Sequence, residues 1–313
     1  MRLTRKLILA LMLVATPVAA SDLAYVTCQN GDALSVLDLS KGVQHHLWAV
    51  PGKPAGVAVD TDAAFTVAAD SKTVRRHDRL TGKVLAQVVQ DGGPMGVAHD
   101  PRRNRLFVSD WYNARIWVLD AMDLSEQAQL TVGAAPAGLA LSDDGRWLAS
   151  ADRDADQVSV FDAATLDLLH RVDVGTRPFG LRFAPDGRLF VGNVGSNDVS
   201  VIDPENGAAL ATVAVGARPY GVAFAQGRAF VTNQYADTLS VIDLGTLRKI
   251  ATLETGEYPE GIDTTPDGQR IVVANWFENT VTVFDADALS VVQHIETCDG
   301  PRAFGTFILG GIE

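Results

Sequence analysis

Residues 219–253 read PYGVAFAQGRAFVTNQYADTLSVIDLGTLRKIATL, and this stretch decides the fold. Short alternating apolar runs are separated by turn residues such as Gln226-Gly227, a pattern typical of β-strands rather than helices. The pattern predicts four strands, at residues 221–224, 228–232, 238–242 and 249–253. Four antiparallel strands in a unit of this length are typical of one blade of a β-propeller.

The same unit recurs along the chain with a period near 41 residues. Two ladders mark it, each with steps of 40, 42, 42, 41, 40 and 42 residues, and each aspartate precedes its proline by sixteen residues. The ladders are Asp38, Asp78, Asp120, Asp162, Asp203, Asp243 and Asp285, and Pro54, Pro94, Pro136, Pro178, Pro219, Pro259 and Pro301. A fixed period of this length indicates a repeat architecture.

The two ends of the chain each carry part of one unit. The N-terminal part begins with a second strand at residues 24–27, and the C-terminal part is a lone first strand at residues 303–308. Joining them in one blade removes the open sheet edges. The prediction is therefore an all-β fold: a seven-bladed β-propeller of four-stranded antiparallel blades, closed by N- and C-terminal strands that share one blade.

The repeat motifs resemble those of the YVTN family of β-propeller repeat proteins. The second strands carry the motif at residues 230–233 and 272–275, with a variant at residues 25–28, and P-x-G and Ser-Val-Ile-Asp motifs accompany it. The resemblance extends over essentially the whole mature chain and implies the propeller fold. It does not fix a function, because the family includes surface proteins and periplasmic accessory proteins, and resembles quinoprotein-dehydrogenase-associated and cytochrome d1-like propellers.

The N-terminus is typical of a secretory signal peptide. Arg2, Arg5 and Lys6 precede an apolar run at residues 7–14, and small residues follow up to Ser21. We expect cleavage after Ala20, which leaves residues 21–313 as a single propeller domain. No later segment is long and apolar enough to span a bilayer, so the sequence predicts a periplasmic protein without membrane insertion.

Charge and motif content narrow the classes of partner. Removing the three basic residues of the signal peptide lowers the formal net charge from −12 to −15, which argues against binding to nucleic acid or anionic lipid. The six histidines form no cluster, and the sequence has no CxxCH motif and no Gly-rich phosphate loop. The sequence predicts no cofactor and no metal site, and we expect a monomer.

Both cysteines depart from the repeat within the closing blade. Cys28 stands where the other blades have Asp70, Asp110, Asp152, Asn193, Asn233 and Asn275. Cys298 lies three residues before Pro301, where other blades have Gly133, Gly175, Gly216 and Gly256. In an oxidising compartment this placement predicts a Cys28–Cys298 disulfide that closes the ring. Two free thiols or a redox-active pair are the alternatives.

Large side chains gather at one end of the predicted channel, around the P-x-G motifs and the loops between second and third strands. Aromatic walls with a few charged groups are typical of ligand sites and of protein interfaces. The candidate binding residues are Arg177, Phe179, Arg218, Tyr220, Tyr258, Glu260, Arg302, Trp111 and Trp276. The alternative is structural: Phe179 and Tyr220 plug the channel, and Arg177 and Arg218 pair with carboxylates.

These observations favour a non-catalytic binding or accessory protein whose partner is a periplasmic protein or a small molecule. One alternative is an accessory subunit of a periplasmic oxidoreductase of the quinoprotein or haem type. The other is a hydrolase resembling metal-dependent lactonases, with Glu260 and Asn193, Asn233 or Asn275 as metal ligands. Against the latter, an Asp or Asn that recurs once per blade is typical of a turn cap.

Overall fold

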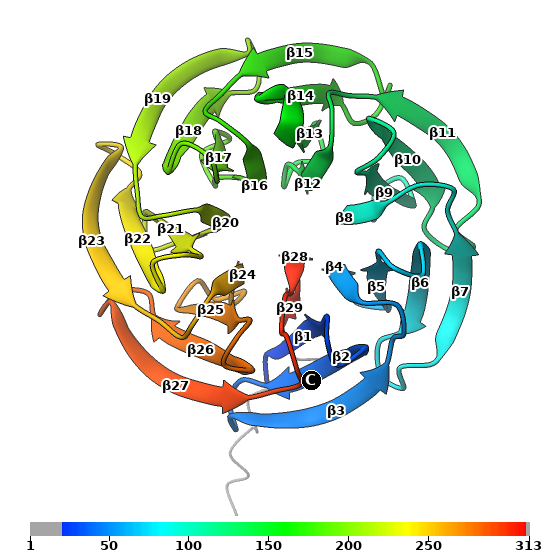
Figure 1. Cartoon of the computed structure of the whole chain (residues 1–313), viewed down its shortest axis with the longest axis horizontal. Helices are drawn as coiled ribbons and strands as arrows, with labels where there is room; N and C mark the ends of the chain where they lie inside the picture. Colours follow the sequence, from blue (N-terminus) through cyan, green and yellow to red (C-terminus); the bar gives the residue numbers. More distant parts are fainter. Residues whose placement is uncertain (1–20, 311–313) are drawn as a thin grey trace, which may run out of the picture.

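The computed structural model describes residues 21–310, which form seven β-sheets arranged as a ring around a central axis (Figure 1). The prediction of a seven-bladed, all-β propeller is confirmed. The expected signal peptide, residues 1–20, lies outside the described residues. Within residues 21–310, no helix has the length and apolar character needed to cross a membrane.

Six blades are continuous in sequence, and each runs from an inner strand at the channel to an outer strand. The first three are β4 (Pro54–Val59), β5 (Ala63–Ala68), β6 (Thr73–Asp78) and β7 (Val84–Val89); β8 (Pro94–Asp100), β9 (Arg105–Asp110), β10 (Arg115–Asp120) and β11 (Glu126–Thr131); and β12 (Pro136–Leu141), β13 (Trp147–Asp152), β14 (Gln157–Asp162) and β15 (Leu168–Asp173). A short 3₁₀ turn, Arg153–Ala155, follows β13.

The next three blades are β16 (Pro178–Phe183), β17 (Leu189–Asn193), β18 (Asp198–Asp203) and β19 (Ala208–Ala214); β20 (Pro219–Ala225), β21 (Arg228–Asn233), β22 (Thr238–Asp243) and β23 (Arg248–Glu254); and β24 (Pro259–Thr264), β25 (Arg270–Asn275), β26 (Thr280–Asp285) and β27 (Ser290–Glu296). A ladder proline begins each of these six inner strands, and a ladder aspartate ends each third strand. The repeat therefore marks strand boundaries.

The glycine of each P-x-G motif lies where neighbouring inner strands come closest. A Cβ atom on Gly180 would lie 2.0 Å from the carbonyl oxygen of Tyr220 in the next blade. Because no side chain fits in that space, only glycine allows the inner strands to pack this tightly around the channel.

A buried hydroxyl in the second strand joins each of several blades to the next. Thr232 of the YVTN-like motif donates to the carbonyl oxygen of Glu260 at 3.0 Å, and Thr27 donates to that of Ala55 at 2.7 Å. Ser109 does the same in its blade. The motif residue thus satisfies a buried carbonyl group at the blade interface.

The closing blade combines both ends of the chain, as predicted. β1 (Leu23–Cys28), β2 (Ala33–Asp38) and β3 (Val43–Ala49) form three of its strands, and β29 (Ile308–Leu309) pairs antiparallel with β1. The expected single strand at residues 303–308 is wrong in detail, because β28 (Phe304–Thr306) separates from β29 and pairs in parallel with β4 of the next blade. Figure 1 shows β28 close to the axis.

Two groups explain this split. Gly305 has a φ of 138°, and a Cβ there would lie 2.1 Å from the carbonyl oxygen of Val57, so β28 can approach β4. After it, the Asp263 carboxylate accepts hydrogen bonds from the backbone N–H groups of Phe307 and Ile308 at 2.8 and 3.0 Å. Arg182 holds the same carboxylate at 2.6 Å. The C-terminal segment is therefore pinned by neighbouring blades.

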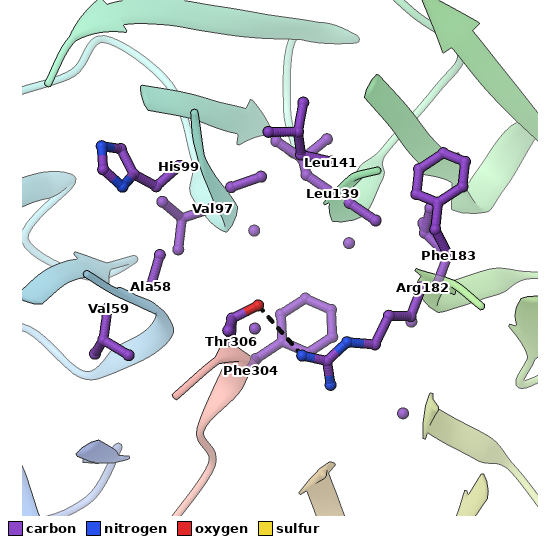
Figure 2. Close-up of a pocket in the computed structure, with 18 of the residues that line it drawn as sticks. Ala58, Val59, Val97, His99, Leu139, Leu141, Arg182, Phe183, Phe304 and Thr306 are labelled. Carbon is purple, nitrogen blue, oxygen red and sulfur yellow. Dashed lines mark hydrogen bonds between the residues drawn. The ribbon is translucent and has the colours of Figure 1, made fainter. Parts of the chain in front are cut away.

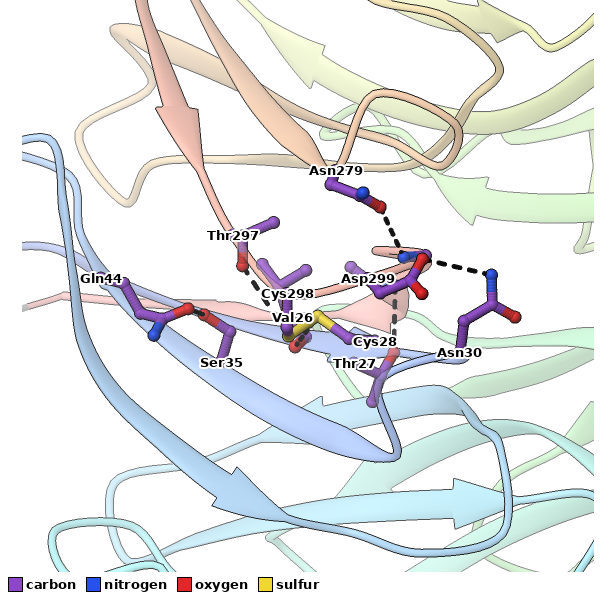
Figure 3. The surroundings of a disulfide bond; sticks show 12 residues. Val26, Thr27, Cys28, Asn30, Ser35, Gln44, Asn279, Thr297, Cys298 and Asp299 are labelled. Carbon is purple, nitrogen blue, oxygen red and sulfur yellow. Dashed lines mark hydrogen bonds between the residues drawn. A yellow bond between two sulfur atoms is a disulfide. The ribbon is translucent and has the colours of Figure 1, made fainter.

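The predicted disulfide is confirmed. Cys28 and Cys298 are bonded across the closing blade, with 5.7 Å between their Cα atoms (Figure 3). In another blade, Asn233 and Gly216 occupy the repeat positions of Cys28 and Cys298. There, Asn233 accepts a hydrogen bond from the backbone N–H of Gly216 at 3.0 Å. A covalent bond thus replaces a polar contact of the repeat at the one place where the chain is open.

Candidate ligand-binding site

A pocket of about 260 Å³ opens at the end of the channel where the inner strands begin. We call it the mouth pocket. Its lining residues are Gln29, Trp111, Arg153, Phe179, Arg218, Tyr220, Gln234, Tyr258, Glu260, Trp276 and Arg302. Eight of the nine predicted site residues are among them. The ninth, Arg177, is exposed and does not line the pocket.

Sequence reasoning missed Gln29, Arg153 and Gln234. All three directly follow the second strand of their blade, as the predicted Trp111 and Trp276 do. The backbone N–H of this residue donates to the carbonyl of the residue before the proline, as in the 3.0 Å bond from Gln234 to Arg218. The repeat position after the second strand was therefore the signal that identifies these residues.

The residues before the prolines adopt the left-handed backbone conformation. Arg218 and Tyr258 have φ angles of 55° and 60°. Their N–H groups donate to Asn197 and Asp237 of the preceding blade at 2.9 and 2.8 Å. These bonds hold a conformation that costs about 1 kcal/mol or more for a non-glycine residue, and so fix where both side chains enter the pocket.

Three aromatic rings, which we call the aromatic plug, pack together in the channel: Phe179 and Tyr220 line the mouth pocket, and Phe304 lines a second cavity on the other side. Phe179 lies 4.4 Å from Tyr220 and 5.1 Å from Phe304 between ring centroids, and all three are buried. A plug of Phe179 and Tyr220 was the structural alternative to a binding site, and Phe304, which lies in β28 close to the axis, was not expected in it. The plug and the mouth pocket are both present, because the three rings close the channel between this pocket and the second cavity.

A buried ion pair lies beside the plug. Arg302 Nε is 2.9 Å from Glu260 Oε2, Gln234 donates to Glu260 Oε1 at 2.6 Å, and Arg302 also donates to the Tyr220 hydroxyl. Burial raises the pKa of Glu260, whereas Arg302, the Gln234 hydrogen bond and Arg218 lower it. Burial lowers the pKa of Arg302, but Glu260 and Tyr220 raise it by more, so the guanidinium stays charged.

Within residues 21–310, Arg218 forms no ion pair with a carboxylate. It donates to the Tyr235 hydroxyl and lies over that ring, with 4.4 Å from Cζ to the ring centroid. The structural alternative predicted that Arg218 pairs with a carboxylate, and for this residue the prediction is wrong. Glu260 faces two arginines, Arg302 and Arg218, so one positive charge at the pocket is left without a neutralising partner.

Several buried polar atoms of the lining lack a hydrogen-bond partner. Among the described residues, they are Nε of Arg218, Oε1 of Gln234 and Nε1 of Trp276, besides Nε of Arg302 and Oε2 of Glu260, which face each other in the ion pair. Gln234 is only 2% exposed, and its Nε2 is already used by Glu260, so its free atom is an acceptor. An unsatisfied buried polar group costs about 1–3 kcal/mol, so these atoms indicate that the pocket is built to receive a polar ligand.

Aromatic rings surround these polar atoms. Tyr258 packs on Tyr235 and Trp276 at centroid distances of 5.5 and 5.8 Å, and Arg153 lies over the Trp111 ring at 5.3 Å. Trp111 and Trp276 belong to blades on nearly opposite sides of the ring in Figure 1. The mouth pocket thus presents flat apolar surfaces on two sides and polar groups between them.

A second cavity, of about 320 Å³, occupies the channel on the other side of the plug (Figure 2). Its walls are mostly small apolar residues of the inner strands, with His99 paired to Asp60 at 3.5 Å and Arg182 donating to Thr306 at 3.4 Å. None of the nine predicted site residues lines it. Of its charged groups, His99 pairs with Asp60 and Arg182 with Asp263, whereas Arg102 donates to the backbone carbonyl of Asp143.

Asn233 and Asn275, two of the three asparagines considered as metal ligands, are used by the fold, whereas Oδ1 of the third, Asn193, has no hydrogen-bond partner among the described residues. Asn233 donates to Thr238 and Ser240 at 3.0 Å each while accepting from Gly216, and Asn275 donates to Thr280 and Thr282. Their amide groups are therefore committed within their own blades. Within residues 21–310, no group of three or more His, Cys, Asp and Glu side chains is placed to hold a metal ion.

The fold and the site define a β-propeller with a small-molecule-sized pocket at one end of its channel. The model of the YNCE-like β-propeller family matches residues 182–309, less than half of the chain. No protein of curated function matches the sequence. The family match and the structural neighbours below confirm a β-propeller of the kind that the repeat motifs indicate.

Solved structures share the fold at low sequence identity. A functionally unknown protein from Desulfotomaculum acetoxidans has a TM-score of 0.77 and 17% identity, covering 93% of this chain and 99% of that one. Dihydro-heme d1 dehydrogenase NirN, in complex with DHE, has a TM-score of 0.66 and 17% identity, covering 89% and 74%. Kuenenia stuttgartiensis hydrazine synthase has a TM-score of 0.53 and 16% identity, covering 69% and 90%.

Proposed function

We propose that the protein is an exported, periplasmic, non-catalytic binding or accessory protein that holds a ligand in the mouth pocket. The observation that carries this proposal is the group of buried, unpartnered polar atoms of Arg218, Gln234 and Trp276 at an open pocket. A rigid ring of blades positions them before any ligand arrives, which lowers the entropic cost of binding. The disulfide agrees with export to an oxidising compartment.

The test is native purification from the periplasm of the source cell, followed by mass spectrometry of bound molecules and partners. Trp111→Ala is the site variant, because Trp111 lines the pocket. Tyr112→Ala is the matched control, since the next residue in the same loop is 74% exposed and does not line it. We expect Trp111→Ala alone to lose the bound molecule or partner. Equal retention by both variants would contradict the proposal.

A second candidate function is an accessory role beside a periplasmic oxidoreductase of the quinoprotein or haem type. The propeller neighbour that is a dihydro-heme d1 dehydrogenase supports it, although that similarity concerns the fold alone. In this case a dehydrogenase or cytochrome should co-purify with the native protein, or the purified protein should show a visible absorption band. A colourless protein that carries only a small molecule would favour the simple binding protein.

The lactonase-like alternative has less support. A metal ion bound to Glu260 would have to displace the Arg302 ion pair and would face the charge of Arg218. Such a site repels a divalent cation. Elemental analysis of the native protein tests this: a stoichiometric metal that is lost in Glu260→Gln would restore the hydrolase hypothesis.

A further inference from the structure

We infer that the ligand of the mouth pocket is a small aromatic acid: one or two rings carrying an oxyanion and a hydrogen-bond donor such as a hydroxyl. This inference rests on the proposed binding function and names the class of ligand. It follows from five features of the pocket, namely its charge, its free donors, its free acceptor, its aromatic walls and its size.

The charge selects an anion. The whole chain has a net charge of −12, yet the pocket contains Glu260 between two arginines, of which only Arg302 lies in direct contact with its carboxylate. The third lining arginine, Arg153, pairs with Asp154. Arg218 therefore supplies a positive charge that the protein does not neutralise, and an anionic ligand group would do so.

The free hydrogen-bonding atoms fit an acid with a second polar group. Arg218 Nε and Trp276 Nε1 can only donate, which suits carboxylate oxygens. Gln234 Oε1 can only accept, and Glu260 holds the amide in that orientation through a 2.6 Å bond to Nε2. A hydroxyl or N–H group of the ligand would therefore donate a hydrogen bond to Oε1 of the buried Gln234. An acid without such a group leaves this atom unsatisfied.

The walls and the volume fit one or two rings. Trp111, Phe179, Tyr258 and Trp276 present aromatic faces, which favour a flat partner. The pocket volume of about 260 Å³ is slightly below the usual range of small-molecule sites, roughly 300 to 1,000 Å³, which favours a small ligand. The aromatic plug prevents a ligand from extending further into the channel.

Isothermal titration calorimetry at pH 7 with three probes of one ring system tests the inference. 6-Hydroxy-2-naphthoate has the anion and the donor, 6-methoxy-2-naphthoate has only the anion, and 2-naphthol has only the donor. We expect the hydroxy acid to bind most tightly and each of the others to bind about tenfold more weakly, or about 1.4 kcal/mol.

Two variants assign the contacts. Arg218→Gln should reduce affinity for both acids about tenfold and leave 2-naphthol unchanged. Arg177→Gln is the control, because Arg177 occupies the same repeat position with the same φ of 55° but does not line the pocket. Gln234→Leu should remove the difference between the hydroxy and methoxy acids, a ratio that a general loss of stability does not change.

The outcomes separate this inference from the proposed function. If 2-naphthol binds as tightly as the hydroxy acid, or if none of the probes binds, the ligand class is wrong. The binding function would still stand if Trp111→Ala loses a molecule or partner that the native protein retains. If Trp111→Ala and Tyr112→Ala behave alike as well, both the ligand class and the binding function fail.

Discussion

Replacing the disulfide by the contact that other blades use should destabilise the ring by several kcal/mol. Cys28→Asn with Cys298→Gly gives the closing blade the same pair as Asn233 and Gly216. The lost bond closes a loop with a sequence separation of 270 residues, for which the chain-entropy relation gives about 5.6 kcal/mol at 25 °C. The restored hydrogen bond offsets about 1 kcal/mol. The expected loss is therefore about 4–5 kcal/mol.

Guanidinium unfolding at pH 7, followed by far-UV circular dichroism and tryptophan fluorescence, measures this loss. The native spectra should match, because β29 still pairs with β1 and Asp263 still holds the C-terminal segment. The m-value should rise slightly, since the unfolded chain without the crosslink exposes more surface. Cys28→Ala with Cys298→Ala, which lacks both the bond and the hydrogen bond, should be about 1 kcal/mol less stable still.

A loss below about 1 kcal/mol would refute the reasoning, because it would mean that the crosslink does not restrict the unfolded chain as the entropy relation requires. A loss as large as predicted but with altered native spectra would point instead to a rearranged closing blade.

Two further predictions concern the buried polar groups of the scaffold. Thr27→Val should lower the free energy of unfolding by about 2 kcal/mol, because its hydroxyl donates to Ala55 and accepts from the Ala303 N–H; a thermal unfolding temperature equal to that of the native protein would contradict this. Burial lowers the pKa of His77 from 6.5 to about 4. The native state therefore disfavours protonated His77, and about 3 kcal/mol of stability present above pH 6.5 should be lost as the pH falls towards 4. His77→Gln should lack this part of the pH dependence in urea unfolding between pH 7 and pH 4.5, and an unchanged dependence would show that His77 is not its source.

Most of the fold could be predicted from the repeat pattern, because the same strand and turn signals recur in each of the seven blades. The ladder prolines mark inner strands and the ladder aspartates mark the ends of third strands. Departures from the repeat were equally informative, since Cys28 and Cys298 replace an Asn–Gly contact and so had to lie together. Most of the mouth residues followed from the same periodicity, and Gln29, Arg153 and Gln234 occupy the same repeat position as Trp111 and Trp276.

The sequence by itself determined the blades, their number, the closure and most of the side chains at the mouth, because strand alternation and turn chemistry are local and periodic. Only the tertiary structure decided which of those side chains meet. Arg177 and Arg218 share a repeat position and a φ of 55°, yet only Arg218 lines the pocket. The Glu260–Arg302 pair and the packing of Phe304 against both Phe179 and Tyr220 join residues from different blades. Their contacts depend on how the inner strands converge on the axis, which no single repeat specifies.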